Sequence, residues 1–325
     1  MFKIFQTVIA ATVAAVGLVA APAPAQAGDE ATPTFTKLVA YVRDGNVFVS
    51  RGAAERQLTT GGGHARPRWS PDGRRLAFLR GGLLWVMNAD GTAKRRVTTR
   101  PAAGPAWSPD GRWIAFASAG CVGGPAVYRI SSTAANAQPA VLFPASCREQ
   151  ALPPVTAAAP APTGTLAQRL RRDDAVAWSP DGARIAFRTG DCEAVYDDCL
   201  SLGNVATGGE RVLAAYGGGG SERSGFAVVP SFRRDGAKVT WTAYQEGEDA
   251  ASTLPVHVVE HDLASGQNRR IGAAEDREMV YEGFASSARG VVTGRHQGAS
   301  WVIAVDLATG ARAPFHKGSQ PAVQP

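Results

Sequence analysis

Short apolar runs separated by turn residues cover most of the chain. Residues 69–73 read WSPDG and precede the run RRLAF, and the same pentapeptide recurs at 107–111 and 178–182 before RWIAF and ARIAF. A divergent copy at residues 232–236 (FRRDG) precedes AKVTW. Proline presets φ at the second turn position, aspartate hydrogen-bonds nearby backbone groups, and glycine accepts positive φ. Each copy therefore predicts two antiparallel strands joined by a tight turn.

These strand pairs belong to a repeat of four strands, named a to d in chain order. Strand a carries the Trp, strand b the LAF-type run, strand c an apolar run ending in a polar turn, and strand d a short partner. Trp85 precedes Asp90 by five residues and Trp301 precedes Asp306 by five, which marks strand c in two repeats. A repeated four-strand unit is typical of β-propeller blades. Full blades, numbered two to six, are expected at about residues 65–99, 103–147, 174–214, 228–272 and 278–315.

The first blade lacks a clear strand a. Its strands b, c and d are expected before the first WSPDG copy, at residues 38–43, 46–50 and 56–59. The last seven residues, 319–325 (SQPAVQP), align with residues 65–71 (ARPRWSP) and match both prolines. We expect this tail to supply the missing strand, because closing the ring removes exposed sheet edges.

The repeat resembles that of the TolB-like six-bladed β-propellers. The resemblance rests on three WSPDG copies, the IAF-type strands after them and a strand ending in Asp-Gly, and it covers about residues 37–325. It implies an all-β fold of six four-stranded antiparallel blades, with the ring closed by the C-terminal tail. TolB carries a further α/β domain for which this chain has no room, so a role in a Tol-type translocation complex is not expected. The repeat is also similar to the propeller that gates prolyl oligopeptidase-type enzymes, whose hydrolase domain has no counterpart here.

Residues 1–27 predict an export signal, followed by a lead-in at residues 28–36. Lys3 precedes an apolar run at residues 4–21, and residues 25–27 (AQA) form a small-x-small cleavage site. The alternative is an uncleaved anchor, because the run approaches the length that spans a bilayer. The alanine-rich run and the cleavage site favour a cleaved protein that is secreted or held in the cell envelope, with no further membrane span.

The composition of the chain excludes some classes of protein and of binding partner. Hydrophobic residues make up 45% of the chain and charged residues 19%, which excludes a disordered protein. Lys and Arg exceed Asp and Glu by 34 − 28 = 6 without clustering, so a nucleic-acid partner is not expected. No cofactor is implied, and we expect a monomer.

The four cysteines predict two disulfides, because an exported chain meets an oxidising compartment. Cys121 and Cys192 each follow the Trp of strand a by 14 residues, which places both at the end of strand b. Cys147 is expected to end strand d of blade three, and Cys199 to begin strand c of blade four. We therefore expect in-blade pairs, Cys121–Cys147 and Cys192–Cys199. Pairing between blades is the alternative, and it would require Cα atoms within about 7 Å.

No catalytic or metal site is assigned. His257–His261 (HVVEH) matches a zinc signature that works on a helix, but it falls in a predicted strand, where Glu260 points away from both histidines. The Trp side chains are expected to pack between blades. Repetition suggests that three aspartates serve their turns: Asp72, Asp110 and Asp181. Three other histidines are expected in solvated loops: His64, His296 and His316.

The expected function is binding. In an up-and-down blade the a–b and c–d turns lie on one face, the turn face, and the b–c and d–a connections lie on the other, the long-loop face. The long-loop face carries the irregular loops and all four cysteines. We expect a protein or glycan to dock there, because loops held by a rigid scaffold often bind. The expected contacts are Asp191, Glu193, Tyr196, Asp197, Asp198, Glu246 and Glu248.

Three alternatives stay open. The first is that the long loops are merely tolerated insertions that bind no ligand. The second is that the chain is a propeller enzyme of the lactonase, phytase or lyase type, with a metal-dependent site in the central channel. A third reading is a structural envelope protein without a discrete ligand.

Overall fold

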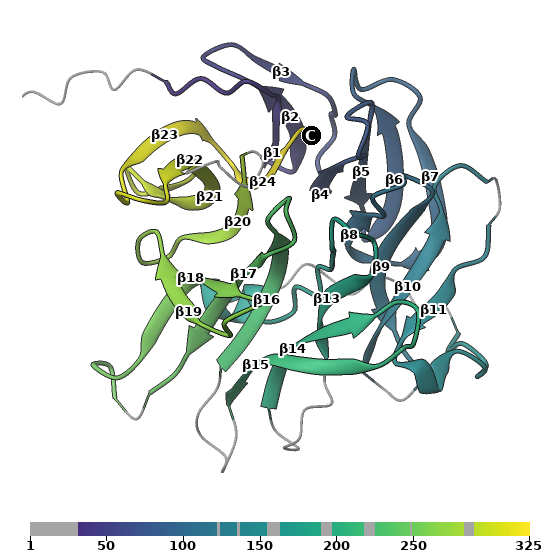
Figure 1. The fold of residues 1–325 in the computed structure, drawn as a ribbon. Coiled ribbons are helices and arrows are strands. Elements are labelled where there is room, and N and C mark those ends of the chain that lie inside the picture. Colours follow the sequence, from purple (N-terminus) through teal and green to yellow (C-terminus); the bar gives the residue numbers. More distant parts are fainter. Residues whose placement is uncertain are drawn as a thin grey trace, which may run out of the picture. The chain divides into compact units, whose positions relative to one another are not determined.

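The described strands form six four-stranded antiparallel sheets, which are the blades of a ring (Figure 1). The computed structural model describes residues 32–121, 124–134, 137–154, 163–189, 197–217, 225–247, 249–282 and 289–325. No helix in these segments is both long and apolar enough to cross a membrane. The predicted all-β, six-bladed fold is confirmed.

Blades one to three follow the predicted strand order a to d. Blade one contains β24 (Ser319–Val323), β1 (Val39–Arg43), β2 (Asn46–Ser50) and β3 (Glu55–Gln57). Blade two contains β4 (His64–Trp69), β5 (Arg75–Arg80), β6 (Leu83–Asn88) and β7 (Arg95–Pro101). Blade three contains β8 (Ala103–Trp107), β9 (Trp113–Ala119), β10 (Pro125–Ser131) and β11 (Ala140–Phe143).

Blades four to six repeat this order. Blade four contains β12 (Ala177–Trp178), β13 (Arg184–Thr189), β14 (Asp197–Asn204) and β15 (Glu210–Gly217). Blade five contains β16 (Gly225–Phe232), β17 (Lys238–Gln245), β18 (Leu254–Asp262) and β19 (Asn268–Ile271). Blade six contains β20 (Arg277–Tyr281), β21 (Arg289–His296), β22 (Ala299–Asp306) and β23 (Arg312–Lys317). The described residues also include a 3₁₀ turn, η1 (Ala145–Cys147), and a short helix, α1 (Leu166–Leu170).

The C-terminal tail closes the ring. β24 pairs antiparallel with β1, so that Val323 lies opposite Val39 and Ala322 opposite Ala40. Figure 1 shows the yellow β24 beside the purple β1 and β2. Strands from the two ends of the propeller thus share one sheet, and the predicted closure is confirmed.

The WSPDG copies form the predicted a–b turns. In the first copy the Ser70 hydroxyl donates to Asp72 Oδ1 at 2.5 Å, and the Gly73 N–H donates to the Ser70 carbonyl at 2.8 Å. Gly73 has φ +68°, which favours glycine. The serine bond is the largest cause that lowers the pKa of Asp72, and the copies at 107–111 and 178–182 repeat this arrangement. The repeated aspartates therefore serve their turns.

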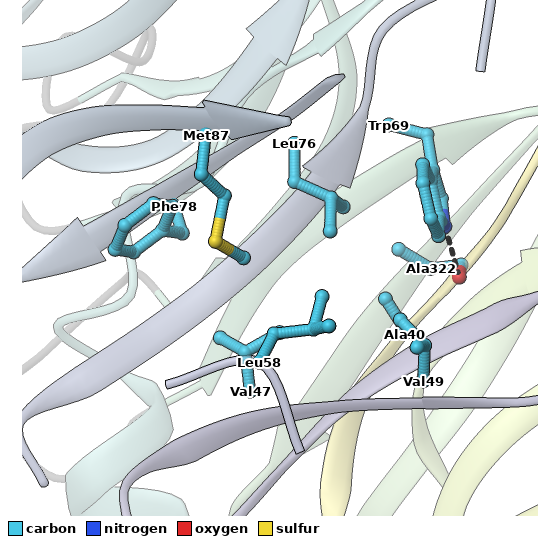
Figure 2. Packing of buried hydrophobic residues seen from close by; sticks show 9 residues of the cluster. All are labelled: Ala40, Val47, Val49, Leu58, Trp69, Leu76, Phe78, Met87 and Ala322. Atoms are coloured by element: carbon cyan, nitrogen blue, oxygen red, sulfur yellow. Dashed lines mark hydrogen bonds between the residues drawn. The ribbon is translucent and has the colours of Figure 1, made fainter. Parts of the chain in front are cut away.

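The Trp of strand a joins neighbouring blades. Trp69 is 7% exposed and packs with Leu58 of blade one and Leu76 of blade two. Its Nε1–H donates to the Ala322 carbonyl at 3.1 Å across the blade boundary (Figure 2). Trp107 donates in the same way to the Arg68 carbonyl of blade two at 3.0 Å. The expectation that these indoles pack between blades is confirmed.

A β-bulge interrupts strand a in five of the six described blades, where the register against strand b shifts in β4, β8, β16, β20 and β24. Proline follows the bulge residue in four of these strands, because a bulge tolerates a residue that cannot donate to the ladder. Four bulge residues have positive φ: Arg66, Val229, Glu278 and Gln320. The bulge therefore frees backbone groups of strand a from the sheet.

One predicted disulfide is described. Cys121 pairs with Cys147 within blade three, with Cα atoms 5.6 Å apart. Cys147 lies in η1 rather than at the end of strand d, because β11 already ends at Phe143. Cys199 is also disulfide-bonded. Cys192, its expected partner, lies outside the described residues.

The expectation that His64, His296 and His316 lie in solvated loops is wrong for all three. His296 ends β21, half-buried, with its ring centroid 5.0 Å from that of Trp301. His64 begins β4 and is buried against Phe78, and its Nδ1 lies 3.1 Å from the Gly45 carbonyl. His316 lies in β23, half-buried, with Nε2 at 2.8 Å from the Gly52 carbonyl. β4 and β23 both extend beyond the apolar runs that mark them in the sequence. They do so because the backbone hydrogen bonds between strands continue through polar residues.

Candidate functional site

The central channel widens into a cavity of about 550 Å³ at the turn face. Strand a or the a–b turn of every blade contributes to its wall. The rim consists of turn prolines, Pro71, Pro109 and Pro180, together with Pro325 of the tail. A cavity of this size lies within the usual range of ligand sites.

The inner end of the cavity is closed. Strand a ends in an aromatic residue in blades two to six and in Val323 in blade one. We call the residue three positions before this end the bulge-level residue. Five of the six bulge-level residues are buried: Arg66, Gly104, Ala175, Val229 and Glu278. The sixth, Gln320, is partly buried. A Cβ added at Gly104 would lie 2.2 Å from the Ala175 Cβ, so blades three and four touch at this level. The cavity therefore opens toward the turn face and ends at the bulge level.

An ion-pair cluster lies at this closed end. Arg66 Nη2 is 2.9 Å from Glu278 Oε1, with side chains 3% and 4% exposed, and the same nitrogen also contacts Asp173. Burial alone would raise the pKa of Glu278, but the Arg66 and Arg277 guanidiniums lower it to about 2. Gln320 bridges the pair, since its N–H donates to Glu278 and its Oε1 accepts from the Arg66 N–H. Arg66 Nη1 has no hydrogen-bond partner among the described residues.

The wall of the cavity is apolar except for a few side chains. Its charged side chains among the described residues are Arg68 and Arg234, and no acidic side chain lines it. Arg234 donates to the Gln324 carbonyl at 3.2 Å, and burial lowers its pKa. Both charged side chains of the described cavity wall are therefore cationic.

Arg68 is the deeper of these two cations. Its Nη1 donates to the Pro67 carbonyl at 2.9 Å and to the Pro321 carbonyl at 3.4 Å. Burial and the nearby Arg66 charge lower its pKa to about 10, so the guanidinium stays protonated at neutral pH. Among the described residues no carboxylate forms an ion pair with it, in contrast to Arg66.

Two tryptophans of the wall, Trp69 and Trp107, present little ring surface, whereas Trp178 and Phe232 are partly buried. Trp69 and Trp107 are buried, with their N–H groups bonded to neighbouring blades. Trp178 donates to the carbonyl of Gly182 in its own turn at 3.0 Å. A sugar ring needs an exposed aromatic face, which Trp69 and Trp107 do not offer.

Three of the seven residues predicted as ligand contacts are described, and none of these three lines the cavity. Asp198 on β14 pairs with Arg188 at 2.6 Å, and Arg188 also pairs with Asp174 at 2.5 Å. Glu246 is exposed just beyond β17, and Asp197 begins β14. Four lie outside the described residues: Asp191, Glu193, Tyr196 and Glu248. Docking on the long-loop face therefore stays a prediction.

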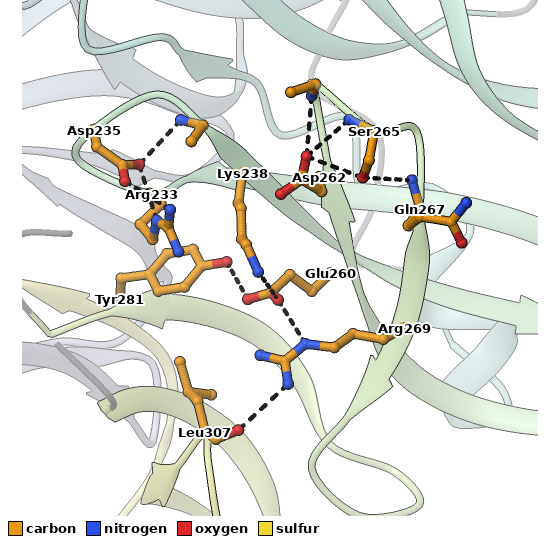
Figure 3. A network of polar contacts seen from close by, with 12 residues as sticks. Arg233, Asp235, Lys238, Glu260, Asp262, Ser265, Gln267, Arg269, Tyr281 and Leu307 are labelled. Atoms are coloured by element: carbon orange, nitrogen blue, oxygen red, sulfur yellow. Dashed lines mark hydrogen bonds and ion pairs between the residues drawn. The ribbon is translucent and has the colours of Figure 1, made fainter. Parts of the chain in front are cut away.

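The HVVEH segment lies in strand β18, as predicted. His257 Nδ1 is 2.8 Å from the Pro255 carbonyl, and His261 Nδ1 is 2.7 Å from Asn268 Oδ1. Glu260 instead accepts a hydrogen bond from Tyr281, in a network of polar contacts at the boundary of blades five and six (Figure 3). In the part of the chain that the structure describes, no three His, Cys, Asp or Glu side chains converge as metal ligands.

Comparison with known proteins supports the fold. No family model and no curated protein matches the sequence. Among solved structures the chain is similar to TolB from Acinetobacter baumannii, at 15% identity and a TM-score of 0.63 over 90% of this chain and 67% of that one. The putative TolB from Agrobacterium tumefaciens gives 16% identity and a TM-score of 0.59 over 87% and 91%. The chain is a six-bladed β-propeller whose fold is similar to that of the TolB proteins. At these identities the likeness concerns the fold alone.

A propeller enzyme has a similar fold. Oligogalacturonate lyase, solved in complex with manganese, gives 13% identity and a TM-score of 0.51 over 88% of this chain and 76% of that one. Manganese favours carboxylate, carbonyl and imidazole ligands. The described wall of the cavity in this chain carries arginines and no carboxylate or imidazole side chain, so its side chains do not fit such an ion.

Sequence reasoning did not single out Arg68 as a cavity residue, although a signal was present. The residue before the aromatic end of strand a lines the cavity in all six blades. In the other five blades that residue is Ala106, Ala177, Ser231, Val280 or Ala322. Aligning the repeats at this position would have shown Arg68 as the one charged residue of the set.

Proposed function

We propose that this TolB-like propeller is an exported binding protein, which holds a segment of a partner protein in the cavity at its turn face. The observation that carries the proposal is the cavity itself, which is apolar, open at one end and built from all six blades. A rigid ring of blades presents this site without reordering, which lowers the entropic cost of binding.

The walls favour a protein segment over a glycan. Strand a pairs only with strand b in each blade, so its other edge faces the channel. Unpaired strand edges bind extended segments through backbone hydrogen bonds. The rim prolines and the alanine side chains suit apolar residues, whereas the buried indoles offer little surface for a sugar.

Export is part of the proposal. The apolar run before residues 25–27 supports a cleaved signal, and the Cys121–Cys147 disulfide supports an oxidising compartment. We expect mass spectrometry of protein from the cell envelope or medium to find a mature chain that begins near Gly28. A chain found only inside the cell with its N-terminus intact would contradict export.

Site-specific photo-crosslinking tests the site. A photoreactive residue is placed at Ser231, which lines the cavity, and at Glu246, which is exposed beyond β17. In cells that make the chain naturally, we expect one protein to crosslink from position 231 and not from position 246. Crosslinks from position 246 alone would support the long-loop face instead and overturn the cavity as the binding site.

A further inference from the structure

We propose that the cavity captures the C-terminal carboxylate of the partner segment and that Arg68 binds it. This inference rests on the proposed function, because it specifies which part of a partner protein enters the cavity. Three features of the cavity carry it: an arginine that forms no ion pair with a described carboxylate, a closed inner end, and a wall without acidic side chains.

Arg68 has N–H donors to spare. Its hydrogen bonds to the carbonyls of Pro67 and Pro321 both come from Nη1. A guanidinium presents five N–H donors in a planar fork that matches the two oxygens of a carboxylate. The remaining donors of Arg68 are therefore available for a ligand in the cavity that this residue lines.

The surroundings of Arg68 favour an anion. Two residues earlier, Arg66 already has carboxylate partners in Glu278 and Asp173. The Arg66 charge lowers the pKa of Arg68 and the Glu278 charge raises it, but burial has the largest effect and lowers it. A buried cation is unfavourable unless a contacting anion compensates for the lost hydration, and a ligand carboxylate in contact with Arg68 would do so.

The closed inner end selects a chain terminus. The bulge-level residues block passage through the channel, so a bound segment must either end inside the cavity or turn back. A single strand that ends inside needs less width than a loop that enters and leaves. A terminus that approaches Arg68 carries a carboxylate if it is the C-terminus and an ammonium group if it is the N-terminus. Only the C-terminus complements the charge.

The apolar wall favours particular residues just before the C-terminal carboxylate of the ligand. Ala106, Ala177 and Val280 lie at the same level as Arg68, and the rim above them is proline. The last residues of the partner are therefore expected to be small and apolar, with no acidic side chain needed for binding.

The test uses a pool of fluorescent five-residue peptides with apolar C-terminal residues, made as free acids and as C-terminal amides. We expect the free acids to bind the mature protein and amidation to weaken binding about tenfold or more, the size expected when a charge-assisted contact is lost. Equal binding of both forms would overturn the proposal. Amidated peptides with an internal Glu that bind as well as free acids would overturn the terminal assignment in favour of a side-chain carboxylate.

Two variants locate the contact. Arg68→Met should abolish the difference between acid and amide, whereas Arg68→Lys should retain part of it. Arg74→Met is the matched control, because Arg74 is an exposed arginine of the neighbouring turn and its loss changes the net charge equally. Unchanged discrimination in Arg68→Met would overturn the assignment. If that variant does not fold, the comparison of acid and amide on the unmodified protein still decides the proposal. Failure of all peptides together with a crosslink from position 231 would reject the carboxylate inference alone, whereas no crosslink at all would reject the proposed function.

Discussion

Arg66 and Glu278 form an ion pair between blades that are not neighbours in the ring, with 2.9 Å between Nη2 and Oε1. Blade one lies between their blades, and its Gln320 bonds to both residues. Glu278 also accepts from the Thr293 hydroxyl at 2.6 Å. The contact therefore joins blades six, one and two where the tail closes the ring.

Glu278→Gln should destabilise the propeller by about 3 kcal/mol, because it leaves buried arginines with less compensation. Urea unfolding followed by tryptophan fluorescence measures the change. Glu275→Gln is the control, since Glu275 is partly exposed and its pair with Arg295, at 3.4 Å, lies on the surface. Equal stability of Glu278→Gln and the unmodified protein would contradict a stabilising role for the pair.

Acid should weaken the fold between about pH 4.5 and pH 2. Despite burial, cationic neighbours and hydrogen bonds lower the pKa of Glu278 and of Glu260 from 4.5 to about 2. The two carboxylates thus bind protons less tightly in the folded state than in the unfolded state. Their contribution to the free energy of unfolding is therefore complete above pH 4.5 and is lost as the pH falls toward 2. Each group should contribute on the order of 3 kcal/mol. Unfolding free energies measured across this range should converge for Glu278→Gln and the unmodified protein near pH 2, and a constant gap would argue against this linkage.

Glu260→Gln should loosen the boundary between blades five and six. Glu260 accepts from Tyr281 at 2.8 Å, Lys238 at 2.9 Å and Arg269 at 2.6 Å (Figure 3). Burial and the Glu260 charge both raise the pKa of Tyr281. In the variant we expect the phenol to titrate at a lower pH, which ultraviolet difference spectra follow. A tyrosine titration identical to that of the unmodified protein would contradict the contact.

Deleting residues 319–325 should abolish cooperative unfolding. The deletion removes β24, exposes the edge of β1 and takes away the Ala322 carbonyl that accepts from Trp69. A synthetic peptide of these seven residues should restore the transition in proportion to its concentration, because it binds only the folded ring. A scrambled peptide is the control. A truncated chain that unfolds as sharply as the full one would show that the tail is dispensable.

Peptide mapping without reductant should recover Cys121 linked to Cys147 and Cys192 linked to Cys199. Reduction of the Cys121–Cys147 bond should lower the free energy of unfolding by about 3 kcal/mol or slightly more. The reason is that this disulfide closes a loop with a sequence separation of 26. Thermal unfolding with and without reductant measures the loss. A Cys121–Cys192 peptide would contradict the in-blade pairing.

The features predicted well are local. The turn at residues 69–73, its aspartate and its glycine recur in sequence because each copy makes the same short-range hydrogen bonds. The missing strand of blade one was also predictable, because the repeat shows which strand is absent and the tail aligns with it. His64 was misjudged because its burial depends on a strand that extends past the apolar run and on packing against Phe78.

The sequence by itself determined the number of blades and their strand order, because these follow from hydrogen bonds and apolar contacts repeated at short range. It also determined the closure of the ring, a long-range pairing, because the tail repeats the strand that blade one lacks. Only the tertiary structure decided that Arg68 lines a closed cavity without a carboxylate partner while Arg66, two residues earlier, is neutralised by Glu278. Two arginines of similar sequence context differ in this way because their partners come from distant blades. Charge compensation depends on distances across the channel, and those exist only once six strands converge on one axis.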